Sequence, residues 1–369
     1  MGTTTTHRRR LEPIRRVLKR HGLDGLLVSN RANVRYLTGF TGSAGMALVT
    51  ANALYLIVDF RYFEQAALES PHSERVHVEA AHYHRAIAQA AEDAGCRTLG
   101  FEADECSYAD YLALGDTLPG LALVPSRHLV ASFREIKDAR EIAAIRRAAE
   151  ATSRAVTATL ATLYPGQTER EVAAEIDRHL SRLGCEGQAF ETLVAFGDRT
   201  ALPHPRPSDR PLAPGDWVLV DAGGVVDGYM ADMTRTIIFG QPNPRQAAIH
   251  QAVRQALASG LAAIRPGAPA SAVDAACRKA LAAAGMDARF GHPAGHGVGL
   301  ELHETPMLAA ETAEPLEPGM ILAVEPGVYM PGEGGCRLEE LVLVTEDGVE
   351  VLTSAPLGLA SLCTPDHSC

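Results

Sequence analysis

Cysteine pairs, aromatic side chains and long apolar runs are all scarce in this chain of 369 residues. Its seven cysteines are odd in number, lie far apart and form no Cys-x-x-Cys pair. They are therefore expected to be reduced thiols, as in a reducing compartment, and not a disulfide framework. No stretch approaches the ~18 consecutive apolar residues of a membrane-spanning helix, so a membrane protein is not expected.

A surplus of positive charge is also absent. The formal net charge is −11, whereas a nucleic-acid surface needs clustered lysine and arginine. One basic cluster, in residues 8–20, follows a helical pattern and is interpreted as a solvated helix face. The first ten residues contain no apolar run typical of a signal peptide. We therefore expect a cytoplasmic protein that binds neither nucleic acid nor a membrane.

The length suits two domains better than one hydrophobic core. Residues 1 to about 131 alternate short apolar runs with amphipathic stretches, which is an α/β pattern. A long alanine- and charge-rich helical pattern begins near Asp138. We therefore place the boundary just before it, and expect a smaller N-terminal domain over residues 1–132 and a larger domain over residues 133–369.

The larger domain contains an internal repeat. Gly166 and Val172 recur as Gly267 and Val273, each 101 positions later. Strand-like apolar runs follow each copy, so the domain is expected to be α+β with two related halves. A site between two such halves would be a natural cleft.

Helix starts are also expected to match between the two copies. Thr168 and Glu171 have the spacing of a capping box, in which each side chain binds the backbone N–H of the other residue. Ser271 and Asp274 are expected to play a similar part in the second copy.

Four carboxylates interrupt or end apolar strands of the larger domain: Asp221, Asp232, Glu325 and Glu339. Burying an ionised carboxylate without a partner costs several kcal/mol or more, so four of them in strands require cations. The chief basic residues close in sequence are Arg235 and Arg337, which supply too little positive charge. We therefore predict a pair of metal ions.

Strand alternation predicts the neighbours of one of these acids. Asp232, Thr234 and Thr236 share one face of their strand. The two threonines are therefore expected to hydrogen-bond Asp232 and to orient it as a metal ligand.

A glycine-rich segment, residues 291–306, adds three histidines within twelve positions: His292, His296 and His303. Glycine allows close backbone approach, and histidine supplies imidazole chemistry. We assign His296, which stands between two glycines, to the metal. A mostly oxygen ligand set with one nitrogen suits Mn²⁺ or Co²⁺, with Zn²⁺ as an alternative.

These motifs together resemble the pita-bread metallopeptidase family, which includes aminopeptidase P, Xaa-Pro dipeptidase (prolidase), methionine aminopeptidase and the metal-free creatinase. Residues 33–43 and 59–62 are similar to the N-terminal domain of the proline-specific branch. The five ligand motifs occur in the family's order, namely Asp221-Ala-Gly-Gly, Met230-Ala-Asp232, His296-Gly-Val-Gly, Val324-Glu325-Pro and Arg337-Leu-Glu339. The resemblance implies a pita-bread catalytic domain with a pseudo-two-fold repeat, preceded by a creatinase-like N-terminal domain.

The resemblance also implies how two metal ions are held. Asp221 would bind one ion, Asp232 and Glu339 would bridge both, and His296 and Glu325 would complete the other. A hydroxide between the ions would be the nucleophile, because two cations lower the pKa of water.

Further catalytic and substrate-binding roles follow from the same resemblance. Glu325 would take and pass the proton of the nucleophile, and His303 would stabilise the developing oxyanion. His204 and His292 match the two remaining site histidines, which contact the substrate backbone and line the proline pocket. Arg337 is expected to orient this network.

The resemblance points to peptides whose second residue is proline. Proline lacks an amide N–H and its ring fixes φ, so a dedicated pocket is required. A dipeptidase must also bind the free carboxylate after proline, normally with arginine or lysine. Prolidases often have an arginine just after the His-Glu-x-Pro segment, where this chain has Met307.

We therefore expect an Xaa-Pro aminopeptidase that forms a homodimer. The alternative is an Xaa-Pro dipeptidase in which an N-domain arginine such as Arg35 or Arg61 binds that carboxylate. A non-catalytic peptide-binding relative is a remote alternative.

Overall fold

The computed structural model describes residues 2–79 and 82–359. Two of the cysteines expected to be reduced, Cys363 and Cys369, lie outside these residues. The chain divides into two units, Met1–Arg134 and Glu135–Cys369. The boundary expected between residues 132 and 133 remains a prediction. None of the helices in the described part is long and apolar enough to cross a membrane.

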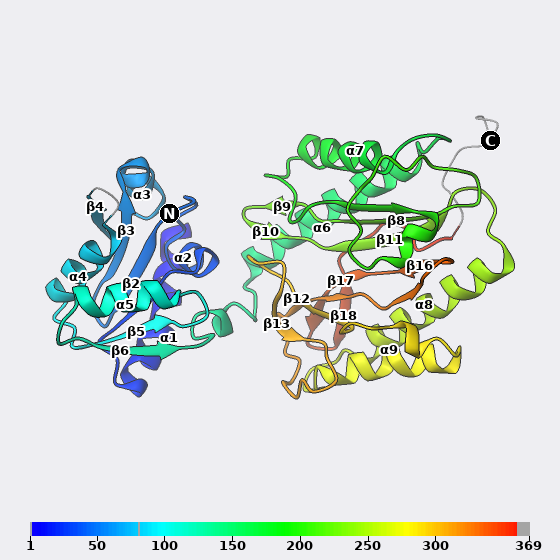
Figure 1. Ribbon diagram of the computed structural model, residues 1–369. Coiled ribbons are helices and arrows are strands. Elements are labelled where there is room, and N and C mark those ends of the chain that lie inside the picture. Colours follow the sequence, from blue (N-terminus) through cyan, green and yellow to red (C-terminus); the bar gives the residue numbers. More distant parts are fainter. Residues whose placement is uncertain (1, 80–81, 360–369) are drawn as a thin grey trace. The chain divides into compact units, whose positions relative to one another are not determined.

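The short apolar runs of the first unit form a six-stranded sheet in the order β4-β3-β2-β1-β5-β6 (Figure 1). β1, β2 and β3 pair antiparallel, whereas β4, β5 and β6 join as parallel strands. The strands are β1 (Gly25–Val28), β2 (Met46–Thr50), β3 (Leu54–Asp59), β4 (Glu74–Val78), β5 (Thr98–Glu102) and β6 (Ala122–Ser126). The helices are α1 (Gly2–His21), α2 (Arg31–Thr38), α3 (Phe63–Glu69), α4 (Tyr83–Asp93) and α5 (Tyr108–Thr117), with short turns η1 (Phe60–Tyr62) and η2 (Ala131–Phe133).

β1 lies inside this sheet and is buried along its whole length. Leu27 belongs to the cluster that includes Ile87 and Ala90 of α4. Alternation along the strand turns Leu26 and Val28 to the opposite face, where both are buried. An apolar strand on both faces is typical of a sheet that helices cover on two sides.

The second unit is built from antiparallel strands with a pair of helices on either side (Figure 1). α6 (Ala139–Leu160) and α7 (Glu169–Arg182) lie on one side, and α8 (Pro244–Ala263) and α9 (Ser271–Ala283) on the other. The two larger sheets have the strand orders β11-β8-β7 and β13-β12-β14-β17-β18, and two hairpins pair β9 with β10 and β15 with β16.

The strands of the first half are β7 (Leu193–Phe196), β8 (Trp217–Ala222), β9 (Val225–Val226), β10 (Tyr229–Met230) and β11 (Met233–Ile238), with the short turn η3 (Gly197–Ala201). The strands of the second half are β12 (Gly295–Gly297), β13 (Glu304–Met307), β14 (Ile321–Val324), β15 (Gly327–Met330), β16 (Gly334–Arg337), β17 (Glu340–Thr345) and β18 (Gly348–Val351), with the turn η4 (Asp287–Arg289).

The internal repeat corresponds to the two helix pairs and their sheets. Val172 of α7 packs in one core with Val218 of β8, and Val273 of α9 packs in another with Leu322 of β14. Each half therefore buries its own apolar surface. The expected α+β class with two related halves is confirmed.

The helix starts differ between the halves. Thr168 and Glu171 form the expected capping box at α7. The expected cap by Ser271 and Asp274 is wrong, because α9 has no side-chain cap. Carbonyl groups of residues 312 and 314 accept the N–H groups at the start of α9 instead. This leaves Asp274 available for another contact.

Candidate metal centre

The four carboxylates singled out in the sequence lie at the ends of strands. Asp221 is near the end of β8, and Asp232 lies between β10 and β11. Glu325 directly follows β14, and Glu339 stands between β16 and β17. Because apolar strands carry each of them into the interior, Asp221, Asp232 and Glu339 are buried.

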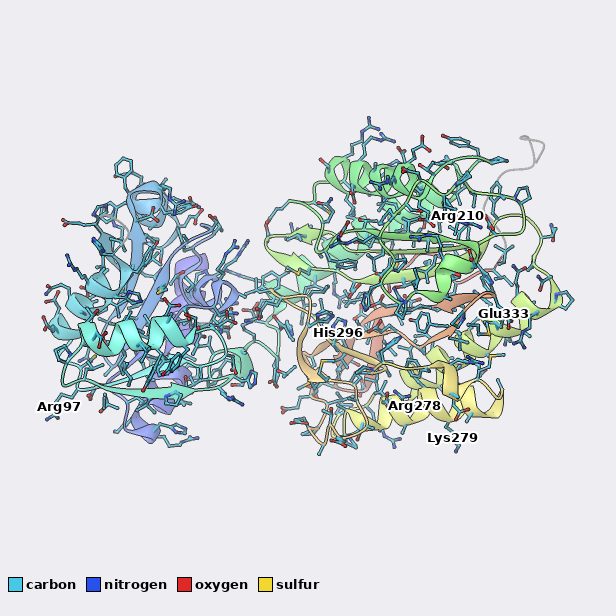
Figure 2. All side chains as sticks on the ribbon, in the orientation of Figure 1. Arg97, Arg210, Arg278, Lys279, His296 and Glu333 are labelled. Carbon is cyan, nitrogen blue, oxygen red and sulfur yellow. The ribbon has the colours of Figure 1, made fainter. Side chains whose placement is uncertain are left out.

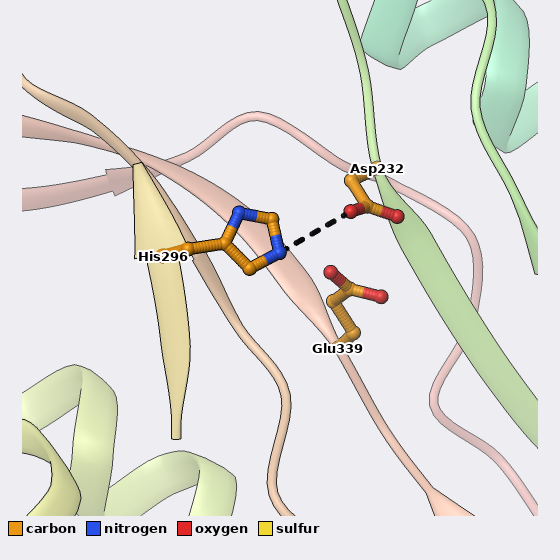
Figure 3. A group of neighbouring side chains, drawn as sticks. All are labelled: Asp232, His296 and Glu339. Carbon is orange, nitrogen blue, oxygen red and sulfur yellow. Dashed lines mark ion pairs between the residues drawn. The ribbon is translucent and has the colours of Figure 1, made fainter. Parts of the chain in front are cut away.

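Asp232, His296 and Glu339 form one compact group (Figure 3). One ligand atom from each residue lies within 4.8 Å of the others. His296 Nε2 is 3.6 Å from Asp232 Oδ2 and 3.8 Å from Glu325 Oε1. His296 Nδ1 is 3.0 Å from the carbonyl oxygen of Gly297, which directs Nε2 toward the carboxylates.

His296 does not supply positive charge to this group. Burial lowers the pKa of His296 to about 4, so the ring is neutral near pH 7 and offers a lone pair to a cation. Its 3.6 Å approach to Asp232 Oδ2 therefore does not join two opposite charges near pH 7.

The carboxylates disfavour one another's ionised forms. Burial, followed by the charges of Glu339 and Asp221, raises the pKa of Asp232 well above its usual value. Burial, followed by Asp221 and Glu325, does the same to Glu339. Burial also raises the pKa of Glu325 to about 7. The cluster is therefore short of positive charge.

Arg337 is the cation that the chain places against this cluster. Its buried guanidinium donates to Asp221 Oδ2 at 2.5 Å and lies 3.9 Å from Glu325 Oε2. The other arginine considered from the sequence, Arg235, is paired with Glu340 at 2.9 Å. One arginine therefore faces four acids.

Two buried carboxylate oxygens in the described part of the chain, Asp221 Oδ1 and Glu339 Oε1, have no hydrogen-bond partner. An unpaired buried oxygen is costly unless a cation binds it. Together with the neutral His296 nitrogen, these oxygens make a donor set that fits divalent metal ions.

The threonine contacts differ from those expected. Thr234 Oγ1 donates to Glu339 Oε2 at 2.8 Å, and it accepts from Arg337 Nε at 3.0 Å. Thr236 Oγ1 donates to the carbonyl oxygen of Arg337. The expected bonds to Asp232 are therefore wrong. The cause is a contact between distant segments. The backbone N–H of Glu339 donates to the carbonyl oxygen of Thr234, which brings the Glu339 carboxylate beside the Thr234 side chain.

His292 precedes His296 in the sequence and His303 follows it. The His303 ring packs edge-on against the His296 ring, with centroids 4.2 Å apart. His292 Nε2 is 2.9 Å from the hydroxyl oxygen of Tyr329. Burial, with a smaller contribution from the charge of the neighbouring His204, lowers the pKa of His303. Burial lowers the pKa of His292 to about 4.

Tyr329 was not identified from the sequence as a site residue. Its hydroxyl accepts from Arg337 Nη1 at 3.0 Å and contacts His292. It therefore joins the arginine beside the acids to one of the site histidines. Tyr329 lies four residues after Glu325, but nothing in the spacing marks where its hydroxyl points.

A buried acid holds the loop that carries His204. Glu169 is fully buried and accepts from the backbone N–H groups of Phe196 at 2.9 Å and Ser208 at 2.8 Å. It also accepts from Arg199 Nε at 3.0 Å. The two ends of the exposed loop around His204 are therefore fixed to the start of α7.

A second buried acid has a similar effect on the other half. Asp274 pairs with Arg278 at 2.7 Å and accepts from the N–H of Ala294 at 3.1 Å. Arg278 donates to the carbonyl oxygens of Phe290 and His292. The backbone of His292 is therefore held by α9. The labelled Arg278 and His296 can be located in Figure 2.

Two family models match the chain, Metallopeptidase family M24 over residues 143–346 and Creatinase/Prolidase N-terminal domain over residues 10–136. An Xaa-Pro dipeptidase of Pyrococcus horikoshii is 32% identical over 347 residues, covering 93% of this chain and 97% of that protein. The solved structure of an Xaa-Pro dipeptidase from Bacillus anthracis has a TM-score of 0.92 at 36% identity, covering 96% of this chain and 99% of that one. An X-Pro aminopeptidase from Thermotoga maritima has a TM-score of 0.87 at 32% identity, covering 95% and 100%.

Removal of divalent ions should destabilise the protein more at pH 8 than at pH 6. A carboxyl group whose pKa is raised on folding contributes stability that is present below its unfolded pKa and lost as the pH rises through the folded value. For Glu325 that window runs from 4.5 to about 7. The chelated protein should therefore melt about 5 °C lower at pH 8 than at pH 6 by circular dichroism.

Glu325→Gln is the matched control, because it removes one of the titrating groups and should reduce the difference between the two pH values. A chelated protein that is equally stable at both, or more stable at pH 8, would contradict this description of the cluster.

Proposed function

The chain belongs to metallopeptidase family M24, in the proline-specific branch of the pita-bread fold, and on that premise we propose that it hydrolyses the bond between an N-terminal residue and a following proline. The pita-bread domain and the creatinase-like N-terminal domain expected from the resemblance are confirmed. Its substrates are small peptides with proline at the second position. The homodimer and the cytoplasmic location remain predictions.

The observation that carries this proposal is the buried acid cluster around a neutral histidine. The family implies divalent metal ions, and the unpartnered oxygens of Asp221 and Glu339 fit them. Two ions would be held by the five residues assigned from the sequence: Asp221, Asp232, His296, Glu325 and Glu339. Mn²⁺ or Co²⁺ suits this donor set, with Zn²⁺ as an alternative.

When bound, divalent ions supply Lewis-acid polarisation of the scissile carbonyl and lower the pKa of water. Glu325 is the residue that exchanges protons. In the metal-free cluster burial raises its pKa to about 7, and cations bound beside it would lower that pKa and keep it a carboxylate that can take a proton. Its side chain is partly buried, with 21% exposed, whereas the other three acids are buried. It would take a proton from water and pass it to the proline nitrogen.

The histidines and Arg337 would act on the substrate. His303 lies against the ligand His296 and is exposed, so its imidazole can donate to the carbonyl oxygen on which negative charge develops. His292 is neutral, and Tyr329 and Arg337 fix its surroundings. With His204 it would contact the peptide backbone and line the proline pocket.

The choice between dipeptides and longer peptides rests on two opposing observations. The Pyrococcus horikoshii and Bacillus anthracis relatives bear the name Xaa-Pro dipeptidase, which favours dipeptides. Met307 favours an aminopeptidase, because it is opposite His296 in the β12–β13 ladder and brings no cation there. We propose Xaa-Pro dipeptides as the preferred substrates, and longer Xaa-Pro peptides as the second candidate.

His303→Ala should lower kcat on the order of 10²–10³-fold, because it removes one donor to the developing oxyanion. Metal content, measured by elemental analysis, should not change. His21→Ala, a substitution on the exposed end of α1, is the control for histidine loss alone. Loss of metal together with activity would make His303 a ligand and would contradict its assigned role.

Substrate length should decide between the two candidates, with kcat/KM measured for Ala-Pro and Ala-Pro-Ala in the presence of Mn²⁺. A dipeptidase should prefer Ala-Pro by about tenfold or more, which is about 1.4 kcal/mol of discrimination. The reverse preference would establish the aminopeptidase. Hydrolysis of neither peptide would contradict the proposed function.

Met307→Arg supplies the reciprocal test, since a cation at this position should pair with the dipeptide carboxylate. It should raise the Ala-Pro to Ala-Pro-Ala ratio. Met307→Leu keeps the position apolar and should leave the ratio near the wild-type value.

A further inference from the structure

A buried ion pair lies next to His303 in the chain. Lys137 Nζ is 3.0 Å from Glu304 Oε2, and the two side chains are 1% and 5% exposed. Glu304 directly follows His303 and is the first residue of β13. Lys137 lies in the segment just before α6, 167 positions away.

Glu304 closes the loop that carries His303. Its Oε1 accepts from the N–H of Glu301 at 3.2 Å, and the N–H of Gly299 binds the carbonyl oxygen of Glu301 at 3.0 Å. A Cβ at Gly299 would come within 2.5 Å of the Glu304 carboxylate, so this carboxylate packs directly on the loop backbone. Gly297 pairs with Glu304 across the β12–β13 ladder. The loop is therefore fixed at its base.

Both the backbone and the side chain of Lys137 make hydrogen bonds that fix its position. Its N–H binds the carbonyl oxygen of Gly319 at 2.9 Å, and Ile136 forms a bridge with Met320. Its Nζ also donates to the carbonyl oxygen of Glu135 at 3.2 Å. Lys137 is therefore a fixed anchor point for the Glu304 carboxylate.

Stability alone does not explain this pair. Desolvation of two buried charges offsets much of their attraction, and apolar residues of similar volume are often as stable or more stable. The pair does define one geometry for the loop. Among the described residues, the His303 imidazole makes no hydrogen bond, and its ring contact is with His296. The direction of the His303 ring therefore depends on the backbone next to it.

We propose that Lys137 and Glu304 are positioning residues that aim His303 at the scissile carbonyl. The role of this pair in catalysis rests on the proposed function, whereas its effect on the orientation of the His303 ring does not. A displacement of about 1 Å in a catalytic group can lower a rate on the order of 10²-fold, so an anchor at the adjacent residue controls catalysis without contacting the substrate.

The decisive variant is Lys137→Met/Glu304→Gln, which removes both charges. Lys137→Met alone would remove one charge of a buried ion pair, which is strongly destabilising. Arg146→Met/Glu350→Gln is the matched control, because it removes an exposed ion pair between α6 and β18.

The first readout does not need activity. In the metal-free protein labelled with ¹³C at histidine Cε1, the His303 signal is identified by its absence in His303→Ala. It should shift and broaden in the Lys137→Met/Glu304→Gln variant, while the signal of His250 on α8 should not move. The control variant should reproduce the wild-type spectrum. An unchanged His303 signal in a folded double variant would overturn the proposal.

The second readout is a mutant cycle that combines the Lys137→Met/Glu304→Gln variant with His303→Ala. In the wild-type background, the double variant should lower kcat for the cleaved Xaa-Pro peptide about tenfold or more with KM changed less than about twofold. In the His303→Ala background, it should lower kcat no further, because the residue that it aims is gone. An equal loss in both backgrounds would make the pair merely structural and overturn the proposal. A wild-type protein that cleaves no Xaa-Pro peptide would refute the proposed function, and the NMR result would still decide the positioning role.

Discussion

The rest of the structure depends on four carboxylates brought together with a single arginine. Burial and mutual repulsion raise the pKa of Asp232, Glu339 and Glu325, and Arg337 is bound most closely to Asp221. The strands that carry these acids are apolar and fix them in place, and three of the four acids are buried, so exposure to solvent relieves little of the repulsion. Divalent cations relieve it and supply the chemistry of a peptidase at the same point.

The acids lie on strands or directly next to them, whereas the three histidines proposed to contact the substrate lie on loops. A buried acid with a basic partner fixes each of these loops. Glu169 with Arg199 holds the loop around His204, and Asp274 with Arg278 holds the backbone of His292. Lys137 with Glu304 holds the loop of His303. A loop carries few apolar contacts of its own, so an ion pair with backbone hydrogen bonds is a direct way to give it one conformation.

Sequence reasoning was strongest for polar residues whose neighbours in the sequence are apolar or glycine. Asp232, beside an apolar strand, and His296, between glycines, are conspicuous because burial of such groups needs a chemical reason. Contacts between distant segments could not be predicted from the sequence in this way. The bond from Thr234 to Glu339 spans 105 positions and the pair of Lys137 with Glu304 spans 167, and no local period encodes either. Asp274 has the spacing of a helix cap, but it pairs with Arg278 one turn along α9 and accepts from the N–H of Ala294.

The central claim is that this acid cluster is a site for two divalent ions, and counting the ions tests it most directly. The chelated protein would be dialysed to equilibrium against Mn²⁺ at pH 8, and bound metal and protein would be measured in the same sample. Two ions per chain are predicted for the wild type, with fewer for Asp232→Asn, which loses a charge shared by both. A folded protein that binds no divalent ion at this pH would contradict the account.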